Sequence, residues 1–144
     1  MIVRRAEADD VEAVLALMAG LGRPEVARDP GRQADVFRAH VEDPQAEVFV
    51  AELDGVVAGA VSLSFRPRLN WTTPEAWVPD LYVDPRFRRR GAARALLDAC
   101  VEAARERGCH RLILESGHER AEAHQLYEGY GFVHSGRAYT LALT

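Results

Sequence analysis

Residues 80–97, DLYVDPRFRRRGAARALL, join the end of an apolar segment to the start of a long amphipathic one. Leu81 and Val83 close a β-rich run, and Asp84-Pro85 stops it. From Ala93 onward, apolar residues recur at helical spacing and end before Gly108: Ala93, Leu96, Leu97, Cys100, Val101 and Ala104. The stretch therefore predicts a strand, a short loop and a helix, which is a building unit of α/β folds.

Five arginines crowd the loop and the helix start of this unit. Arg86, Arg88, Arg89, Arg90 and Arg94 lie within nine residues that contain no acid. The first N–H groups of a helix lack intrahelical partners and lie at the positive end of its dipole, so they attract anions. Small side chains at Gly91, Ala92 and Ala93 let a phosphate approach the backbone closely. The pattern predicts a pyrophosphate cradle, and its alternative is a solvated arginine face at an ordinary helix start.

The composition supports a small anionic ligand. The chain has 144 residues, a formal net charge of −4, and 18 basic residues that are all arginine. Without the five clustered arginines the net charge becomes −9, whereas a nucleic-acid-binding domain is usually basic over a whole face. The absence of lysine excludes a Schiff-base lysine, a Ser-Lys nucleophile and a Walker P-loop. The length predicts a single domain over residues 1–144.

The chain carries no pattern of secretion or membrane insertion. Its first ten residues, MIVRRAEADD, turn polar at once, and no run approaches the roughly 20 apolar residues of a membrane span. Two cysteines, Cys100 and Cys109, do not make a disulfide framework, and we expect free thiols in a cytoplasmic protein. The five histidines are scattered, so no metal site is predicted. The alanine-rich, lysine-free composition suggests a GC-rich bacterial genome.

The remaining periodicities predict a mixed α/β layer fold in the order β-α-α-β-β-β-α-β-α-β. Asp54-Gly55 predicts a tight hairpin turn between two strands. The predicted strands cover residues 2–6, 47–53, 56–65, 75–83, 111–115 and 132–143. The predicted helices cover residues 11–21, 32–41, 93–107 and 119–130, with a loop over 22–31.

Three motifs resemble those of the GNAT superfamily of N-acetyltransferases. Arg88-x-x-Gly91-x-Ala93 is similar to its acyl-CoA-binding signature, (Gln/Arg)-x-x-Gly-x-(Gly/Ala). Asp80-Leu81-Tyr82-Val83-Asp84-Pro85 resembles the end of the family's fourth strand, and residues 122–132 resemble its closing motif. The motifs stand in family order, and the element order matches over nearly the whole chain. One departure is Ala121, where many members carry an asparagine that contacts the pantetheine arm.

The resemblance implies a GNAT-like fold with splayed central strands and acetyl-CoA as co-substrate, without a metal. The acetyl group would pass directly to a primary amine of a small molecule or peptide. The pyrophosphate would bind the α-helix start, the pantetheine would lie along the fourth strand, and a backbone N–H near Val83 would stabilise the oxyanion. The implied cofactor residues are Leu81, Tyr82, Val83, Arg88, Arg89, Arg90, Gly91, Ala92, Ala93 and Arg94.

The resemblance also implies roles in proton transfer. Tyr127 stands where the family places a general acid for the CoA thiolate, and the alternative is a core aromatic with a satisfied hydroxyl. Asp80 and Glu115 are candidate bases for the attacking amine. Either carboxylate could instead bind a cationic substrate or pair with an arginine.

The resemblance also implies which residues line the site of the acceptor amine, because loops form that site in the family. Trp71, Trp77 and Tyr139 are expected to form an apolar wall, and Glu75 and Asp80 to supply negative charge. The acidic remainder of the chain favours a cationic amine, such as a polyamine, an aminoglycoside-like sugar, a lysine or a protein N-terminus. Family members often pair as homodimers, so a homodimer is an expected state.

Two other functions compete with acetyl transfer. One is a non-catalytic acyl-CoA-sensing or partner-binding module on the same fold, which the retained Tyr127 and complete loop disfavour. The other is an anion- or nucleic-acid-binding domain that uses the arginines. The acidic remainder and the lack of an aromatic–basic stacking surface disfavour that one.

Overall fold

The computed structural model describes residues 1–22, 26, 28–115, 121–136 and 138–144. Its sheet has the strand order β1-β2-β3-β4-β5. The strands are β1 (Ile2–Arg5), β2 (Ala46–Leu53), β3 (Val56–Arg66), β4 (Glu75–Val83) and β5 (Leu112–Leu114). All neighbours are antiparallel except β4 and β5, which are parallel and are joined by the crossover helix α4 (Ala92–Glu106).

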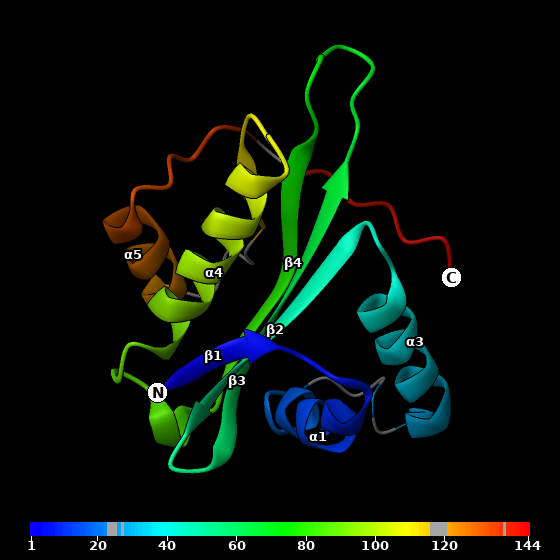
Figure 1. Ribbon diagram of the computed structural model, residues 1–144, viewed down its shortest axis with the longest axis vertical. Coiled ribbons are helices and arrows are strands. Elements are labelled where there is room, and N and C mark those ends of the chain that lie inside the picture. The colour runs from blue at the N-terminus through cyan, green and yellow to red at the C-terminus, as the bar shows by residue number, and fades with distance from the viewer. Residues whose placement is uncertain (23–25, 27, 116–120, 137) are drawn as a thin grey trace.

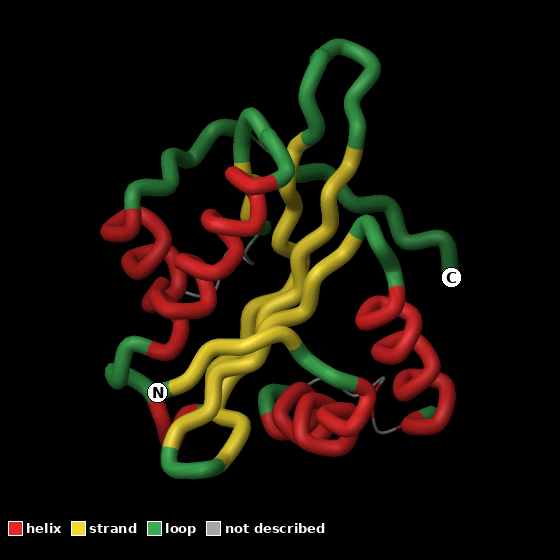
Figure 2. The backbone as a smooth tube through the Cα atoms, in the orientation of Figure 1, coloured by secondary structure: helices red, strands yellow, loops and turns green. Residues whose placement is uncertain are grey.

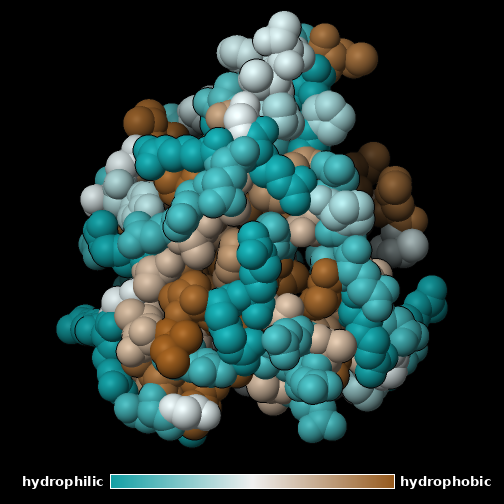
Figure 3. All heavy atoms as spheres, in the orientation of Figure 1, coloured by the Kyte–Doolittle hydropathy of each residue, from teal (hydrophilic) through white to brown (hydrophobic). Residues whose placement is uncertain are grey.

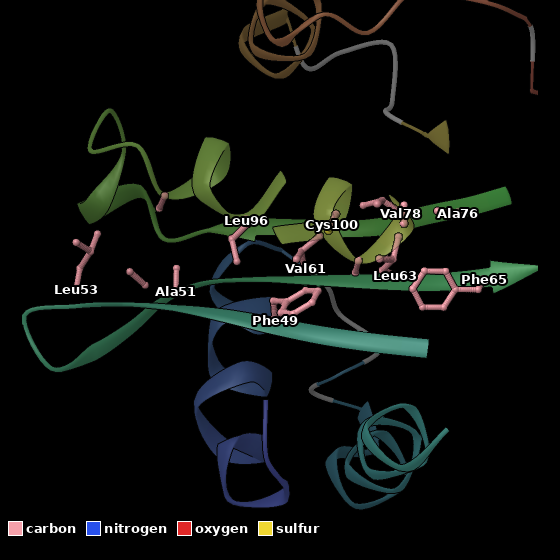
Figure 4. Close-up of a cluster of buried hydrophobic side chains, with 14 residues drawn as sticks. Phe49, Ala51, Leu53, Val61, Leu63, Phe65, Ala76, Val78, Leu96 and Cys100 are labelled. Carbon is pink, nitrogen blue, oxygen red and sulfur yellow. The ribbon is translucent and has the colours of Figure 1, made fainter. Parts of the chain in front are cut away.

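Helices cover both faces of this sheet. Figures 1 and 2 show α4 and α5 (Ala121–Tyr130) on one face, with α1 (Val11–Gly20) and α3 (Pro30–Glu42) on the other. The core beneath α4 includes Leu63, Val78 and Cys100 (Figure 4). A second core beneath α1 and α3 includes Phe37 and Tyr82. The sheet is therefore the middle of three layers.

A bulge in β4 changes which side chains face each layer. Ser62 pairs with Asp80, but Ser64 pairs with Trp77, so β4 has one residue more than β3 over this interval. Before the bulge, Val78 packs in the core under α4. After it, Leu81 packs on that core while Tyr82 packs under α1 and α3. Without the extra residue, Asp80 and Tyr82 would face α4 instead.

The same bulge separates β4 from β5. The parallel pairing joins residues 76–78 to residues 112–114 and stops there. The next residue of β4 is Pro79, which has no N–H to donate to a neighbouring strand. Within the described chain, the second half of β4 therefore has no partner on the β5 side. The splay that the family resemblance implies is present.

Most predicted elements form, with shifted ends. The second helix begins at Pro30 rather than residue 32, because Asp29 caps it by accepting a hydrogen bond from the Arg32 N–H (3.0 Å) and proline suits the first helical position. The hairpin turn is confirmed: Asp54 and Gly55 have φ values of 53° and 76°, as a twist-matched two-residue turn requires. In the predicted loop over 22–31, residues 23–25 and 27 lie outside the described residues.

The predicted last strand is wrong for the part of it that the structure describes. Residues 132–136 and 138–144 form no strand. The edge they would join is only the three residues of β5, which offers few hydrogen bonds to a further strand. Apolar side chains of this segment lie at least 83% exposed: Val133, Tyr139, Leu141 and Leu143. In the view of Figure 3 the surface is mostly hydrophilic, and apolar atoms gather in separate groups.

Both cysteines are free thiols, as expected. Cys100 is fully buried in the core under α4, and burial raises the pKa of its thiol to about 12. Cys109 is half-buried, and burial raises its pKa as well. None of the described helices is both long and apolar enough to cross a membrane.

Gly59 lets α4 pack closely on the sheet, and this gives a stability prediction. A Cβ at Gly59 would lie 3.0 Å from the Tyr82 carbonyl oxygen and 3.2 Å from Leu96 Cδ1. We expect Gly59→Ala to lower the free energy of unfolding by about 1–3 kcal/mol, because the backbone must shift. Urea denaturation measures this.

A matched control is Gly129→Ala in α5, where a Cβ would meet nothing within 4 Å. That change should leave stability unaltered or raise it by up to about 1 kcal/mol, through helix propensity. Equal effects of the two substitutions would contradict the close-packing role of Gly59.

Candidate functional site

The loop before α4 presents backbone N–H groups around a concave turn. Asp84 ends β4 by accepting a hydrogen bond from the Arg86 N–H (2.9 Å), and residues 85–87 form a short 3₁₀ turn. Arg89 and Gly91 then adopt left-handed backbone, with φ values of 61° and 83°. Alternating backbone of this kind makes an anion-binding nest. The loop is therefore shaped for an anion before any side chain is considered.

The start of α4 continues this surface. Gly91 is the N-cap residue and has no side chain to cap the helix. The first backbone bond of the helix comes from the Ala95 N–H to the Gly91 carbonyl (3.0 Å). No acceptor within the described residues takes the N–H groups of residues 92–94. These unpaired donors and the positive end of a 15-residue helix favour a phosphate at this position.

The arginines of the loop surround the start of α4 at the surface. Four of them contact a neighbour: Arg86 with Asp84 (2.8 Å), Arg88 with Glu122 (3.7 Å), Arg90 with Asp54 (3.2 Å), and Arg94 over the ring of Tyr130 (5.2 Å). Arg89 makes no ion pair with any described residue. Exposed ion pairs of this kind are weak, so the guanidinium groups can turn to a bound anion.

The other predicted cofactor residues divide between core and loop. Ala92 is 2% exposed and packs in the core under α4, so its small size serves packing. Ala93 is half-buried at the helix start. Leu81 and Val83 lie on the part of β4 that has no partner on the β5 side, so their backbone is open there. Tyr82 is 5% exposed and belongs to the opposite core, so only its backbone can serve a ligand beside β4.

A pocket lies on the other face of the sheet, between α1, α3 and β2–β4. Its cavity volume is about 90 Å³, and the pocket opens to solvent. Apolar residues make up most of its lining: Val14, Leu15, Met18, Val36, Phe37 and Val48, with Ala60 and Val61 from β3, of which Val61 packs its side chain in the core under α4. The polar lining residues are Gln33, His40, Ser62, Asp80 and Tyr82. Such a pocket suits a small ligand with an apolar body.

Asp80 is the acidic group of this pocket. Its carboxylate accepts hydrogen bonds from the hydroxyls of Tyr82 (2.8 Å) and Ser62 (3.4 Å). No arginine or histidine of the described chain forms an ion pair with it. An ionised carboxylate that lacks a cationic partner in an apolar lining attracts a positively charged ligand.

Tyr127 is held at the end of α5. The Phe132 N–H donates to the Tyr127 carbonyl (2.9 Å), and Gly131, with a φ of 122°, ends the helix. The ring of Phe132 meets that of Tyr127 edge-on at 6.1 Å. The next turn of α5 is tied to α4 by the Tyr130 hydroxyl, which donates to Asp98 (2.6 Å). Burial and Asp98 raise the pKa of Tyr130 to about 12.

Glu75 lies in a charged cluster at the other end of β4. Its carboxylate is fully buried and accepts hydrogen bonds from Arg66 (2.8 Å), Arg68 (3.1 Å) and Arg111 (2.9 Å). Burial alone would raise the pKa of Glu75, but the three guanidinium groups outweigh it and lower the pKa to about 2. The negative charge of this carboxylate is therefore bound by arginines within the fold.

The predicted acceptor residues do not gather at the pocket. Trp71 stacks on His110 (4.1 Å), and Trp77 lies under the guanidinium of Arg66 (4.7 Å), both beside the Glu75 cluster. Tyr139 is 88% exposed in the C-terminal segment. Glu115 follows β5 and is exposed. Of the predicted acceptor and base residues, only Asp80 lines the pocket.

Several site residues were not predicted from the sequence. Ser62 and the Tyr82 hydroxyl orient Asp80, and Met18 and Phe37 line the pocket. The available signal was Pro79, because a proline inside a predicted strand marks a bulge. In the described chain, no group of three or more metal-binding side chains is close enough to hold an ion.

The sequence matches a known family and curated relatives. The profile of the acetyltransferase (GNAT) family matches residues 14–132. The aminoalkylphosphonate N-acetyltransferase of Salmonella typhimurium is 29% identical over 141 residues, covering 98% of this chain and 90% of the relative. The aminoglycoside N(6′)-acetyltransferase type 1 of Stenotrophomonas maltophilia is 30% identical, covering 94% and 88%. Some relatives are longer: this chain spans 33% of the Rattus norvegicus N-acetylaspartate synthetase.

Solved structures share the fold at lower identity. A transcriptional regulator from Bacillus halodurans C-125 superposes with a TM-score of 0.88 at 23% identity, covering 99% of both chains. The acetyltransferase AAC(6′)-Iy, solved with the bisubstrate analogue CoA-S-monomethyl-acetylneamine, has a TM-score of 0.84 at 20% identity, covering 99% and 97%. At these identities the likeness establishes the fold.

The Glu75 cluster predicts how stability depends on pH. Because the folded pKa of Glu75 is about 2 and an unfolded glutamate titrates near 4.5, the ionised form stabilises the fold above about pH 4.5. That stability is lost as the pH falls through 2, and it amounts to about 3 kcal/mol. Denaturation of the wild type and of Glu75→Gln between pH 7 and pH 2 measures it.

The difference in unfolding free energy between the two proteins should shrink across this window. A difference that stays constant from pH 5 to pH 2 would show that Glu75 is not held ionised by its arginines.

Proposed function

Because this chain belongs to the acetyltransferase (GNAT) family and is an acetyl-CoA-dependent N-acetyltransferase, we propose that it moves the acetyl group directly to a primary amine of a small molecule or peptide. One observation carries the proposal. The anion nest and the open start of α4 come directly after the half of β4 that has no described partner on its β5 side. The amine pocket lies on the other face of the same strand.

The cofactor would bind at the loop and along β4. The N–H groups of residues 92–94 and the left-handed turns at Arg89 and Gly91 would hold the pyrophosphate, with the arginine side chains around it. The extended pantetheine would pair with the open backbone of Leu81 and Val83, as an added strand does. The CoA bisubstrate analogue bound by AAC(6′)-Iy, which shares this fold, supports the assignment.

The thioester would then lie near the point where β4 leaves β5. As the amine attacks, the thioester oxygen gains negative charge, and a backbone N–H near Val83 would stabilise it. Because the bulge leaves one residue of β4 outside the ladder with β3, backbone groups are free in this region. The chemistry needs no metal, since oriented N–H groups supply the positive charge.

Asp80 would bind the amine and take up its proton. The carboxylate already has two hydroxyl donors and lies in the pocket, so an ammonium completes its partners. Loss of one proton from the ammonium gives the free amine that attacks the carbonyl carbon. The carbonyl then re-forms as the C–S bond breaks, and we assign protonation of the departing thiolate to the Tyr127 hydroxyl. The second proton lost from the nitrogen, which leaves a neutral amide, restores the Tyr127 hydroxyl through solvent.

The non-catalytic acyl-CoA-binding module that the sequence left as an alternative is not retained, because the family profile and the N-acetyltransferase relatives support an enzyme. The pocket with an acidic group is consistent with an acceptor site. We also propose a cytoplasmic location, because both cysteines are free thiols.

Gly91→Glu tests the cofactor site. The new side chain would need a left-handed φ of 83° and would place a negative charge at the nest. We expect the Kd for acetyl-CoA in isothermal titration calorimetry to rise at least about tenfold. Gly108→Glu is the matched control, because Gly108 also has a left-handed φ (70°) but follows the far end of α4. A Kd unchanged by Gly91→Glu would remove the loop as the cofactor site.

Tyr127→Phe tests the general acid. The thiolate would leave without its proton donor, so kcat should fall on the order of 100-fold while the Kd for acetyl-CoA changes little. Thiol release over a panel of amines gives kcat. Tyr130→Phe is the control: it removes the hydroxyl bonded to Asp98, so stability should fall while kcat stays close to that of the wild type. If Tyr127→Phe retains full kcat, another group protonates the thiolate.

A further inference from the structure

The pocket beside β4 combines one anionic group with mostly apolar walls. Asp80 is its single carboxylate among the described lining residues, and no described arginine lines it. The walls come from α1 and α3, where Val14 and Phe37 are buried and Val36 is half open to solvent. The other polar lining residues are Gln33 and His40 on α3, and Ser62 and Tyr82 beside Asp80.

We propose that the acceptor is a primary amine with a single positive charge on an apolar alkyl or aryl chain, without an anionic group. This inference rests on the proposed acetyl transfer and specifies its substrate class. It differs from what the curated relatives are named for, aminoalkylphosphonates and aminoglycosides.

The charge of the ligand follows from Asp80. Its two oxygens each accept one hydroxyl, from Ser62 and Tyr82, which leaves about two acceptor sites for the N–H groups of one ammonium. That ammonium balances the single negative charge. A second ammonium would find no carboxylate among the described lining residues, and its desolvation would be uncompensated.

The body of the ligand follows from the walls. A phosphonate would need cationic donors to replace its hydration, and the described lining offers only the imidazole of His40, whose Nδ1 is 2.9 Å from the Val36 carbonyl oxygen. An amino sugar carries many hydroxyls, and most of them would lose water against apolar walls such as Val14, Leu15 and Met18. The few polar side chains of the described lining would replace only part of that water. An apolar chain instead gains from burial against the same side chains.

A panel of acceptors assayed at one fixed pH tests the inference. It contains n-alkylamines from propyl to hexyl, 2-phenylethylamine, 2-aminoethylphosphonate, spermidine and kanamycin, with thiol release as the readout. We expect kcat/KM to rise about fourfold per methylene along the alkylamines, since each methylene is buried. The kcat/KM of hexylamine and of 2-phenylethylamine should exceed that of 2-aminoethylphosphonate, spermidine and kanamycin at least tenfold.

A charge introduced into the wall gives a second test. Val36→Arg places a cation at the pocket from an exposed helix position, so folding is retained. It should lower kcat/KM for hexylamine at least tenfold and raise it for 2-aminoethylphosphonate. Ala39→Arg is the matched control on the same helix, exposed and outside the lining, and should leave both values unchanged.

The outcomes separate this inference from the proposed function. Preference of the wild type for the phosphonate, spermidine or kanamycin overturns the substrate class and leaves acetyl transfer standing. If no amine is acetylated, the proposed acetyl transfer is wrong. Calorimetry of hexylamine with the CoA-loaded protein then shows whether the pocket binds an apolar ammonium. Hexylamine binding that Asp80→Asn weakens at least tenfold retains the apolar ammonium site, and undetectable binding overturns it.

Discussion

The extra residue in β4 is the constraint on which the site depends. A strand alternates its side chains strictly, so one inserted residue exchanges the two faces for everything that follows. Val78 lies under α4, yet Asp80 and Tyr82 lie under α1 and α3. Pro79 removes a donor at the same point, and the pairing with β5 ends one residue earlier. One local irregularity thus opens the edge of β4 and turns its carboxylate toward the pocket.

Two other features hold this irregular strand in place. At its start, three guanidinium groups fix the buried carboxylate of Glu75 and join β3, β4 and the segment before β5. At its end, the Asp84 N–H donates to the Ala58 carbonyl of β3 (2.8 Å). Gly59 then lets α4 approach closely enough to bury Leu96. The strand is therefore anchored at both ends and free of β5 in its second half, as a pre-formed site requires.

The sequence was sufficient for the local features and insufficient for the long-range ones. The loop before α4 and the Asp54-Gly55 turn could be predicted, since both depend on backbone geometry that a few adjacent residues set. The last strand was predicted over residues 132–143, but a strand also needs an edge of adequate length, and β5 spans three residues. Glu75 and Asp80 look alike in the sequence. The arginines that bind Glu75 come from β3 and from loops, and Ser62 reaches Asp80 from β3, so only the fold distinguishes the two carboxylates.

The two faces of β4 also bear on how this protein can change over time. The open edge and the loop at α4 depend on backbone and on small residues, whereas the pocket depends on side chains of α1 and α3. Mutations that reshape the pocket leave the other layer of the sheet intact, because each layer has its own core. Lineages that share this fold can therefore diverge in the molecule they modify while inheriting one means of holding the donor. Selection for a new specificity should accumulate on α1 and α3 and spare the α4 side.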